Sequence, residues 1–311
     1  MTVDSTSSVA AGPAAPAARA AGPALGVLLA FASFALFSFS DASVKLLRGA
    51  VPPAESAFFG AVLGLAVLFS TPGQGGRWRD LFVTTNRPLW LLRFFALPIS
   101  VIGSVVAFTH LPMAEAFVLM FLQPAFVTVM SVLFLKEGVD ARRWGAVVIG
   151  FIGVLVVLRP GFRELGVGHV GAVFAGLGGG VSVVVFRALG NRESTYSLFG
   201  VGMLGSIVIC GGLMLPRFVL PDAWQWLKLL GYGLLSAYAY LLLLRAARLA
   251  PAAHVSPTQY SQMLWAILLD ALLFETTVDL FTLTGIVLIV GSGLLTLMRE
   301  KRGMMGVAAN H

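Results

Sequence analysis

The chain contains ten stretches of about 17 to 22 mostly apolar residues, and this feature constrains its fold more than any other. Because an α-helix rises about 1.5 Å per residue, each stretch is long enough to cross a hydrocarbon core of roughly 30 Å. Only 11% of the residues are charged and 58% are hydrophobic, whereas soluble domains carry about 25% charged residues. The sequence therefore predicts an all-α polytopic membrane protein whose main solvent is the lipid bilayer.

Glycine, proline and charged residues separate the apolar stretches and set their approximate ends. Five predicted spans fall in each half of the chain. The spans are 24–46, 55–70, 89–108, 114–135, 144–158, 168–189, 196–215, 224–244, 252–273 and 280–298.

The distribution of lysine and arginine predicts how the spans are oriented, because these residues are enriched in cytoplasmic loops. With a cytoplasmic N-terminus, 15 of the 21 basic residues fall on the cytoplasmic side. The other six are Lys45, Arg48, Arg159, Arg163, Arg217 and Lys228. We therefore expect a multi-pass protein of the bacterial inner membrane with both termini in the cytoplasm. Two termini on the same side require an even number of spans, which agrees with ten.

The two halves resemble each other in sequence. LPMAEAFVLMFLQP (111–124) leads to LFLKEGVDARRWG (133–145) in the first half, and LAPAAHVSPTQYSQM (249–263) leads to LLFETTVDLFTLTG (272–285) in the second. Because five spans separate equivalent elements, the two repeats must lie in opposite orientations in the membrane. Inverted repeats with a binding site at their interface are characteristic of secondary carriers.

These repeats define the predicted domain organisation. The first repeat covers 24–160 and the second covers 168–298. Residues 1–23 are rich in alanine, proline and serine and are expected to form a disordered cytoplasmic tail. A second cytoplasmic tail is expected at 299–311.

The motifs of the first half resemble the EamA repeat of the drug/metabolite transporter (DMT) superfamily. The matching residues are Leu111, Pro112, Ala114, Ala116, Pro124, Leu135, Glu137, Gly145, Gly150 and Gly153. The second copy departs from this pattern at Met263, where the mid-span proline is expected, and Gly60 stands where the family often has an arginine. The resemblance implies transport of small metabolites through a central cavity. The first half is most similar to uptake carriers for riboflavin or S-adenosylmethionine.

Ionisable residues inside spans are energetically costly and usually mark a cavity or a transport pathway. Asp41 and Lys45 share one face of the first span and are candidates to neutralise each other while contacting a solute or coupling ion. The alternative is that Lys45 extends to the membrane interface.

Glu115 at the start of span four corresponds in the repeats to His254 at the start of span nine. We expect these residues to act as gate or protonation sites on the two sides of the membrane. As alternatives, Glu115 stabilises the first turn of its helix and His254 lies among lipid headgroups.

Span nine is the most polar of the ten, and it carries Gln259, Tyr260, Gln262 and Trp265. Polar groups in hydrocarbon need partners, so one face of this span is expected to line the cavity. Helix–helix hydrogen bonding is the alternative.

Further candidates lie in spans three, four, eight and nine. Gln123 and Pro124 are expected to interrupt span four near the transport site. Arg93 binds either an anionic group or a lipid headgroup, and Tyr232 lines either the cavity or an aromatic belt. Asp270 is assigned to the membrane interface.

The predicted function is secondary active transport of a small metabolite across the inner membrane by alternating access, with proton coupling. A riboflavin- or S-adenosylmethionine-like solute is the expected substrate, and an exporter of amino acids or other metabolites is the alternative. An intramembrane enzyme is a remote alternative, because no protease, prenyltransferase or nucleotide-binding motif occurs. The single cysteine, Cys210, excludes an internal disulfide. We expect no catalytic residue, metal, cofactor or nucleic-acid partner, and a homodimer stays open.

Overall fold

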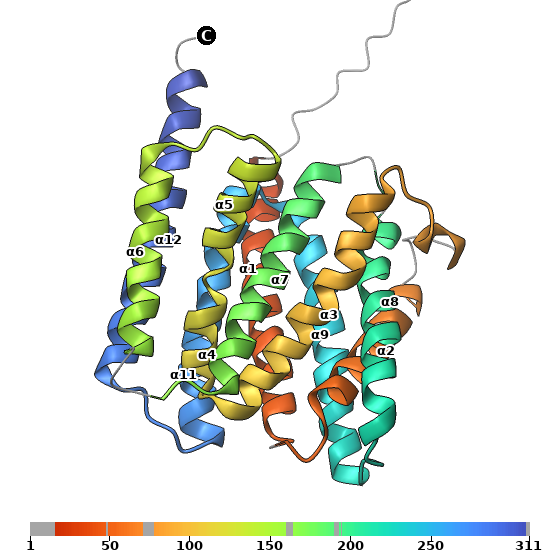
Figure 1. Ribbon diagram of the computed structural model, residues 1–311. Coiled ribbons are helices and arrows are strands. Elements are labelled where there is room, and N and C mark those ends of the chain that lie inside the picture. Colours follow the sequence, from red (N-terminus) through yellow and green to blue (C-terminus); the bar gives the residue numbers. More distant parts are fainter. Residues whose placement is uncertain are drawn as a thin grey trace, which may run out of the picture.

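The computed structural model (Figure 1) describes residues 16–47, 49–70, 78–159, 164–189, 193 and 195–308. Within these residues the chain forms helices and no strand. Residues 1–15 of the expected N-terminal tail lie outside this range. The helices are α1 (Pro16–Lys45), α2 (Pro53–Ser70), η1 (Trp78–Leu81), α3 (Arg87–His110), α4 (Met113–Met120), α5 (Gln123–Phe134), α6 (Ala141–Leu158), α7 (Val167–Leu189), α8 (Thr195–Met214), η3 (Leu215–Arg217), α9 (Ala223–Leu249), α10 (Ala252–Val255), η4 (Ser256–Tyr260), α11 (Ser261–Leu273) and α12 (Leu280–Ala308).

In the described part of the chain, seven segments are long and apolar enough to cross a membrane, with α4 and α5 counted together. The apolar parts of α6 and α12 are shorter, at Trp144–Leu158 and Leu280–Leu294. Span nine is divided into α10, η4 and α11. These ten helical units confirm the predicted all-α fold of two five-helix repeats.

Spans four and nine are each interrupted within the helix. Span four divides into α4 and α5 directly before Gln123, with Pro124 in the first turn of α5. In span nine the interruption is the 3-10 turn η4, which contains Pro257. Proline lacks a backbone N–H and its ring obstructs the preceding turn, so both prolines favour a break. The second break therefore lies upstream of Met263, the position at which the repeat pattern places a proline.

Equivalent helix ends in the two repeats make the same backbone hydrogen bonds, 139 positions apart. At the end of α5, the Ser131 carbonyl accepts from the N–H groups four and six residues later, and the Asp270 carbonyl does the same at the end of α11. Five residues after each of these, Lys136 and Glu275 both adopt left-handed backbone with φ of 54° and 53°. Ser131 and Asp270 are therefore structural equivalents.

The same spacing holds at the start of spans four and nine. The Leu111 N–H donates to the Ala107 carbonyl, and the Ala250 N–H donates to the Ala246 carbonyl. Because the offset is 139 residues at both ends of these spans, the predicted correspondence of Glu115 with His254 follows.

The helices of the two repeats are interleaved. Helix α1 of the first repeat packs along α9, and α7 of the second packs along α3. The Ser33 hydroxyl donates to the Ala239 carbonyl at 2.7 Å. At the equivalent positions, with donor and acceptor exchanged, the Ser100 hydroxyl donates to the Ala175 carbonyl at 2.8 Å. Figure 1 shows α6 and α12 side by side at one edge. This pairing is that of inverted repeats related by a pseudo-two-fold axis.

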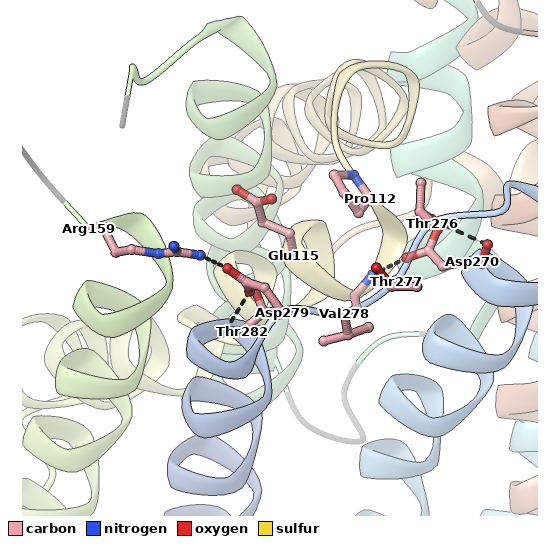
Figure 2. Close-up of a pocket in the computed structure, with 10 residues that line it drawn as sticks. Pro112, Glu115, Arg159, Asp270, Thr276, Thr277, Val278, Asp279 and Thr282 are labelled. Carbon is pink, nitrogen blue, oxygen red and sulfur yellow. Dashed lines mark hydrogen bonds and ion pairs between the residues drawn. The ribbon is translucent and has the colours of Figure 1, made fainter. Parts of the chain in front are cut away.

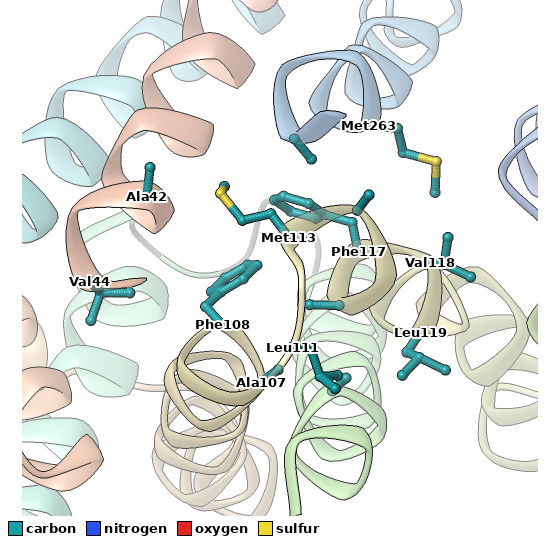
Figure 3. Packing of buried hydrophobic residues seen from close by; sticks show 14 of the residues in the cluster. Ala42, Val44, Ala107, Phe108, Leu111, Met113, Phe117, Val118, Leu119 and Met263 are labelled. Atoms are coloured by element: carbon teal, nitrogen blue, oxygen red, sulfur yellow. The ribbon is translucent and has the colours of Figure 1, made fainter. Parts of the chain in front are cut away.

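The main buried cluster surrounds α4 (Figure 3). Met113, Phe117 and Leu119 of α4 pack there with Phe108 of α3 and Met263 of α11. Large apolar side chains elsewhere point outward from many helices, including α5, α6 and α12. A soluble protein would bury such side chains, so this outward face is the surface that lipid covers.

Candidate functional site

Two buried pairs of ionisable side chains lie at the end of the bundle where α4 and α12 begin, the lower end in Figure 1. We call this the Glu115 end, and we call the opposite end, where α10 begins, the His254 end. Each pair joins a helix of the first repeat to a helix of the second.

The first pair links α1 to α11. Lys45 Nζ lies 2.9 Å from Asp270 Oδ1 and also donates to the Leu111 carbonyl at 3.0 Å. The other carboxylate oxygen of Asp270 accepts from the Ala114 backbone N–H at 2.9 Å. The side chains are only 12% and 1% exposed. Lys45 thus pairs with Asp270 rather than with Asp41, and Asp270 is buried, which corrects its assignment to the interface.

The second pair links α4 to α7. Glu115 Oε1 lies 3.0 Å from His169 Nε2, and both side chains are buried. The backbone N–H of Gly166 donates to His169 Nδ1 at 3.0 Å. Because Nδ1 acts as an acceptor, the imidazole proton resides on Nε2 and is donated to the glutamate. The contact is therefore a hydrogen bond from the His169 imidazole to the Glu115 carboxyl group.

A cavity of about 300 Å³ lies beside these pairs (Figure 2). Its charged lining residues are Glu115, Asp270, Arg159 and Asp279, and Arg159 forms an ion pair with Asp279. Figure 2 shows threonine side chains from the α11–α12 connection between these charges. Side chains of both charge signs with hydroxyl groups suit a small polar solute.

His254, the equivalent of Glu115, lies at the opposite end of the bundle. It is partly buried, and its Nδ1 atom has no hydrogen-bond partner among the described residues. The structure therefore places the two predicted protonation sites at separate ends, and of the two, within the described residues, Glu115 alone contacts another ionisable side chain.

Asp41 and Tyr232 lie together between α1 and α9. Asp41 interacts electrostatically with the Tyr232 phenol and makes no hydrogen bond or ion pair within the described chain. The Tyr232 ring packs over Gly60 of α2, where an added Cβ would lie 2.5 Å from the ring. An aromatic side chain from the other repeat therefore fills the place where the family often has an arginine.

Arg93, which occupies the position equivalent to Tyr232, is only 3% exposed. Its Nε donates to the Leu198 carbonyl of α8, and its guanidinium lies 4.1 Å above the Phe186 ring of α7. Its Nη1 atom has no hydrogen-bond partner among the described residues. The Arg93 guanidinium is thus held by contacts within the protein, and its binding of an anionic group stays a prediction.

The polar residues of span nine do not gather at one place. Tyr260 stacks on Phe121, with ring centroids 5.4 Å apart, and Trp265 lies 5.8 Å and 6.0 Å from the rings of Phe31 and Phe39 of α1. The other two candidates on this span, Gln259 and Gln262, are partly buried.

The break in span four faces α7 on one side. The Gln123 carboxamide lies over Gly179, where an added Cβ would be 2.9 Å from its oxygen, whereas Pro124 is exposed. Gln123 and Pro124 thus lie at the break in span four, as predicted. The Gln123 side chain faces α7, whereas Pro124 is exposed.

Outside the spans, Glu193 connects two loops. Partial burial opposes its ionisation, but hydrogen bonds from the Thr85 backbone, the Thr85 hydroxyl and the Thr84 hydroxyl outweigh this effect and lower the pKa of Glu193. The ionised carboxylate thus fixes the loop before α3 to the loop after α7.

Sequence reasoning did not select His169, Arg159 or Asp279 as candidates. His169 carries a usable signal, because a histidine in the first turn of a span is an ionisable group near membrane depth. Asp279 begins α12, where its carboxylate accepts from the Thr282 N–H at 2.9 Å, so its sequence pattern is that of an ordinary helix cap.

Comparisons with known proteins agree with this architecture. The chain is 28% identical over 285 residues to the pseudopaline exporter CntI of Pseudomonas aeruginosa, covering 89% of this chain and 96% of that protein. It is 23% identical over 277 residues to an S-adenosylmethionine uptake transporter of Rickettsia prowazekii, covering 88% and 92%. It is 28% identical over 259 residues to a riboflavin transporter of Rhizobium johnstonii, covering 82% and 84%.

A solved crystal structure shares the fold, with a TM-score of 0.63 at 19% identity over 90% of this chain and 99% of the other. The model of the EamA-like transporter family matches residues 24–159 and 166–298, which together make up most of the sequence. Two matches in tandem correspond to the two five-helix repeats, and the chain belongs to the EamA-like transporter family.

Proposed function

We propose that this transporter moves a small metabolite across the bacterial inner membrane by alternating access, with both termini in the cytoplasm. We further propose that Glu115 and His169 bind the coupling proton. The observation that carries the proposal is that both buried pairs of ionisable side chains at the Glu115 end cross between the repeats.

Contacts between the repeats are those that a rocking motion must break and reform. Lys45 belongs to the first repeat and Asp270 to the second, and the same division separates Glu115 from His169. Separating a buried pair leaves two charges without partners, which is costly. A solute or a proton that compensates one of these charges therefore lowers the cost of opening this end.

The Glu115–His169 pair is suited to proton binding. A proton that adds to Glu115 cancels the charge that the His169 Nε2–H group stabilises. A proton that adds to His169 Nδ1 displaces the hydrogen bond from the Gly166 N–H. Either event weakens a contact that joins α4 to α7, so proton binding and opening are linked.

The proposed substrate is a riboflavin- or S-adenosylmethionine-like solute, and export of amino acids or other metabolites is the alternative. The relatives support both, because they include transporters named for riboflavin and S-adenosylmethionine as well as an exporter. The cavity lined by Glu115, Asp270, Arg159 and Asp279 supports a solute that carries charged groups.

The test is transport by purified protein in proteoliposomes. Radiolabelled riboflavin, S-adenosylmethionine and amino acids are supplied with and without an imposed pH gradient. We expect gradient-driven accumulation of one compound and at least a tenfold loss of the initial rate in Glu115→Gln, which removes the ionisable group but keeps its size.

Glu164→Gln is the matched control, because Glu164 is an exposed glutamate at the same end of the bundle. We expect it to transport at the parental rate. Accumulation that is equal in Glu115→Gln and in the control would exclude Glu115 as the proton site while leaving transport itself established. Movement that does not respond to the gradient would contradict proton coupling.

A further inference from the structure

The two ends of the bundle carry equivalent cations but not equivalent anions. Lys45 near the end of α1 corresponds to Arg187 near the end of α7, 142 positions later, the same spacing that relates Ser33 to Ala175 in the matched hydrogen bonds. Asp270, the partner of Lys45, corresponds to Ser131. The His254 end therefore keeps the cation and has a serine in the place of the aspartate.

The surroundings of the two cations differ accordingly. Lys45 is 12% exposed and bonds to Asp270 at 2.9 Å. Arg187 is 43% exposed, with its Nη1 atom 3.4 Å from the Ser131 hydroxyl and 3.8 Å from the Glu137 carboxylate. Glu137 is also 43% exposed, and an exposed pair at this distance is worth little. Arg187 thus keeps most of its capacity to bind a carboxylate.

Because Ser131 replaces the aspartate, the described part of the His254 end also lacks the contacts between helices that Asp270 makes at the Glu115 end. At the Glu115 end, Asp270 accepts from the Ala114 N–H and Lys45 donates to the Leu111 carbonyl, so one ion pair holds α1 and α11 against the start of α4. At the His254 end, no described contact joins Arg187 to the equivalent corner between α9 and α10. The two ends therefore differ in how firmly they are closed.

The local charge favours an anion at this place. Arg93 lies on the ring of Phe186, the residue next to Arg187, and it has no carboxylate partner among the described residues. Arg93 thus adds positive charge near this end of α7, and the carboxylate recorded against Arg187 among the described residues is the exposed Glu137. Arginine binds carboxylates through two parallel hydrogen bonds, so the chemistry of the site selects a carboxylate.

We propose that Arg187 and Ser131 form a carboxylate-binding subsite at the His254 end, in the place that the Asp270 side chain fills at the Glu115 end. A carboxylate carried by the solute binds Arg187 in the way that the Asp270 carboxylate binds Lys45. Its binding draws α5 and α7 towards the α9–α10 corner and closes this end. The inference rests on the proposed alternating access, and it adds the chemical group that the solute must carry.

The test supplies the missing carboxylate within the protein. Spin labels are placed at Ala141, at the start of α6, and at Arg248, near the α9–α10 corner, in a Cys210→Ala background. The distance between the labels is measured by pulsed electron paramagnetic resonance in nanodiscs. We expect Ser131→Asp to shift the distribution to shorter distances, whereas the neutral isostere Ser131→Asn keeps the parental distribution.

Arg187→Gln provides the second comparison. Combined with Ser131→Asp, it should restore the parental distance, because the new carboxylate then has no guanidinium partner. A distance that is equal in Ser131→Asp and Ser131→Asn, or a shift that survives Arg187→Gln, would overturn the proposal.

A small probe tests the carboxylate directly. Sodium acetate should shorten the label distance in the parent protein, while acetamide, its uncharged analogue, should not at equal ionic strength. The acetate effect should disappear in Arg187→Gln, and equal responses to both probes would rule out a carboxylate subsite. The label distances are measured in the absence of transport. Failure of the proposed proton coupling and failure of the proposed subsite can therefore be told apart.

Discussion

At the scale of single residues, the Asp270 carboxylate joins α11 to two helices of the first repeat. It binds Lys45 from α1 and the Ala114 N–H at the start of α4 while its own backbone ends α11. Lys45 also lies 4.5 Å above the Phe274 ring, so its charge is compensated on two sides. Removing the carboxylate charge alone leaves a largely buried ammonium group without its anion.

We therefore predict that Asp270→Asn lowers the free energy of unfolding in detergent by about 3 kcal/mol, the lower end for breaking a buried ion pair. The lower value applies because the Lys45 ammonium keeps the Leu111 carbonyl. Adding Lys45→Met should recover part of the loss, since no charge is then left unpaired. Asp222→Asn, at the exposed start of α9, is the control, because asparagine caps a helix as well as aspartate does. Equal stability of Asp270→Asn and this control would show that the ion pair adds nothing.

At the scale of helices, the close pairing of α3 with α7 depends on small residues. An added Cβ at Gly103 would lie 2.6 Å from the Gly171 carbonyl oxygen and 2.8 Å from the Ala175 nitrogen. Both atoms belong to the backbone, so no side chain can move aside to make room. Small residues at such crossings are how helices approach closely within a membrane.

Gly103→Ala is expected to destabilise the protein by about 1 to 3 kcal/mol, because the extra methyl group separates the two helices. Gly212→Ala in α8 is the matched control, since nothing lies within 4 Å of its added Cβ. Alanine favours helix over glycine by about 1 kcal/mol, so the control should be neutral or slightly more stable. Thermal unfolding in detergent measures both, and a Gly103→Ala protein as stable as the control would show that α3 and α7 tolerate separation.

At the scale of the whole molecule, the two repeats fix which loops share a side of the membrane. The α5–α6 connection lies at the His254 end and the α6–α7 connection at the Glu115 end. In the proposed orientation, with both termini in the cytoplasm, the His254 end faces the cytoplasm. Gly138 in the first connection has open space around it, and Glu164 in the second is exposed, so both positions accept a reporter cysteine.

In a Cys210→Ala background, we predict that a membrane-impermeant maleimide labels Glu164→Cys in intact cells. Gly138→Cys should react only after the membrane is permeabilised, since it faces the cytoplasm. The buried native thiol is removed so that it cannot react after permeabilisation. Labelling of both positions from outside would contradict the ten-span arrangement, and the reverse pattern would invert the orientation.

The fold followed from the sequence because span length and repeat similarity are local patterns. Glu115 and His254 could be matched from the same patterns, since they occupy one register in each repeat. The partners of the buried ionisable residues could not be predicted from these local patterns. Lys45 and Asp270 are 225 positions apart and meet only when α1 packs on α11. Asp41 illustrates the same limit, since its helical spacing from Lys45 suggested a pair that the distant Asp270 replaces.

The stacked rings of Phe121 and Tyr260 have a mechanical consequence. These two residues are equivalents of each other, 139 positions apart, and their centroids are 5.4 Å apart. The axis that relates the two repeats passes midway between equivalent positions, so two such positions in contact lie directly beside it. A movement that exchanges the conformations of the two ends turns about that axis, and atoms on it travel least. In the proposed alternating access, we therefore expect the Phe121–Tyr260 stack to move less than either end of the bundle.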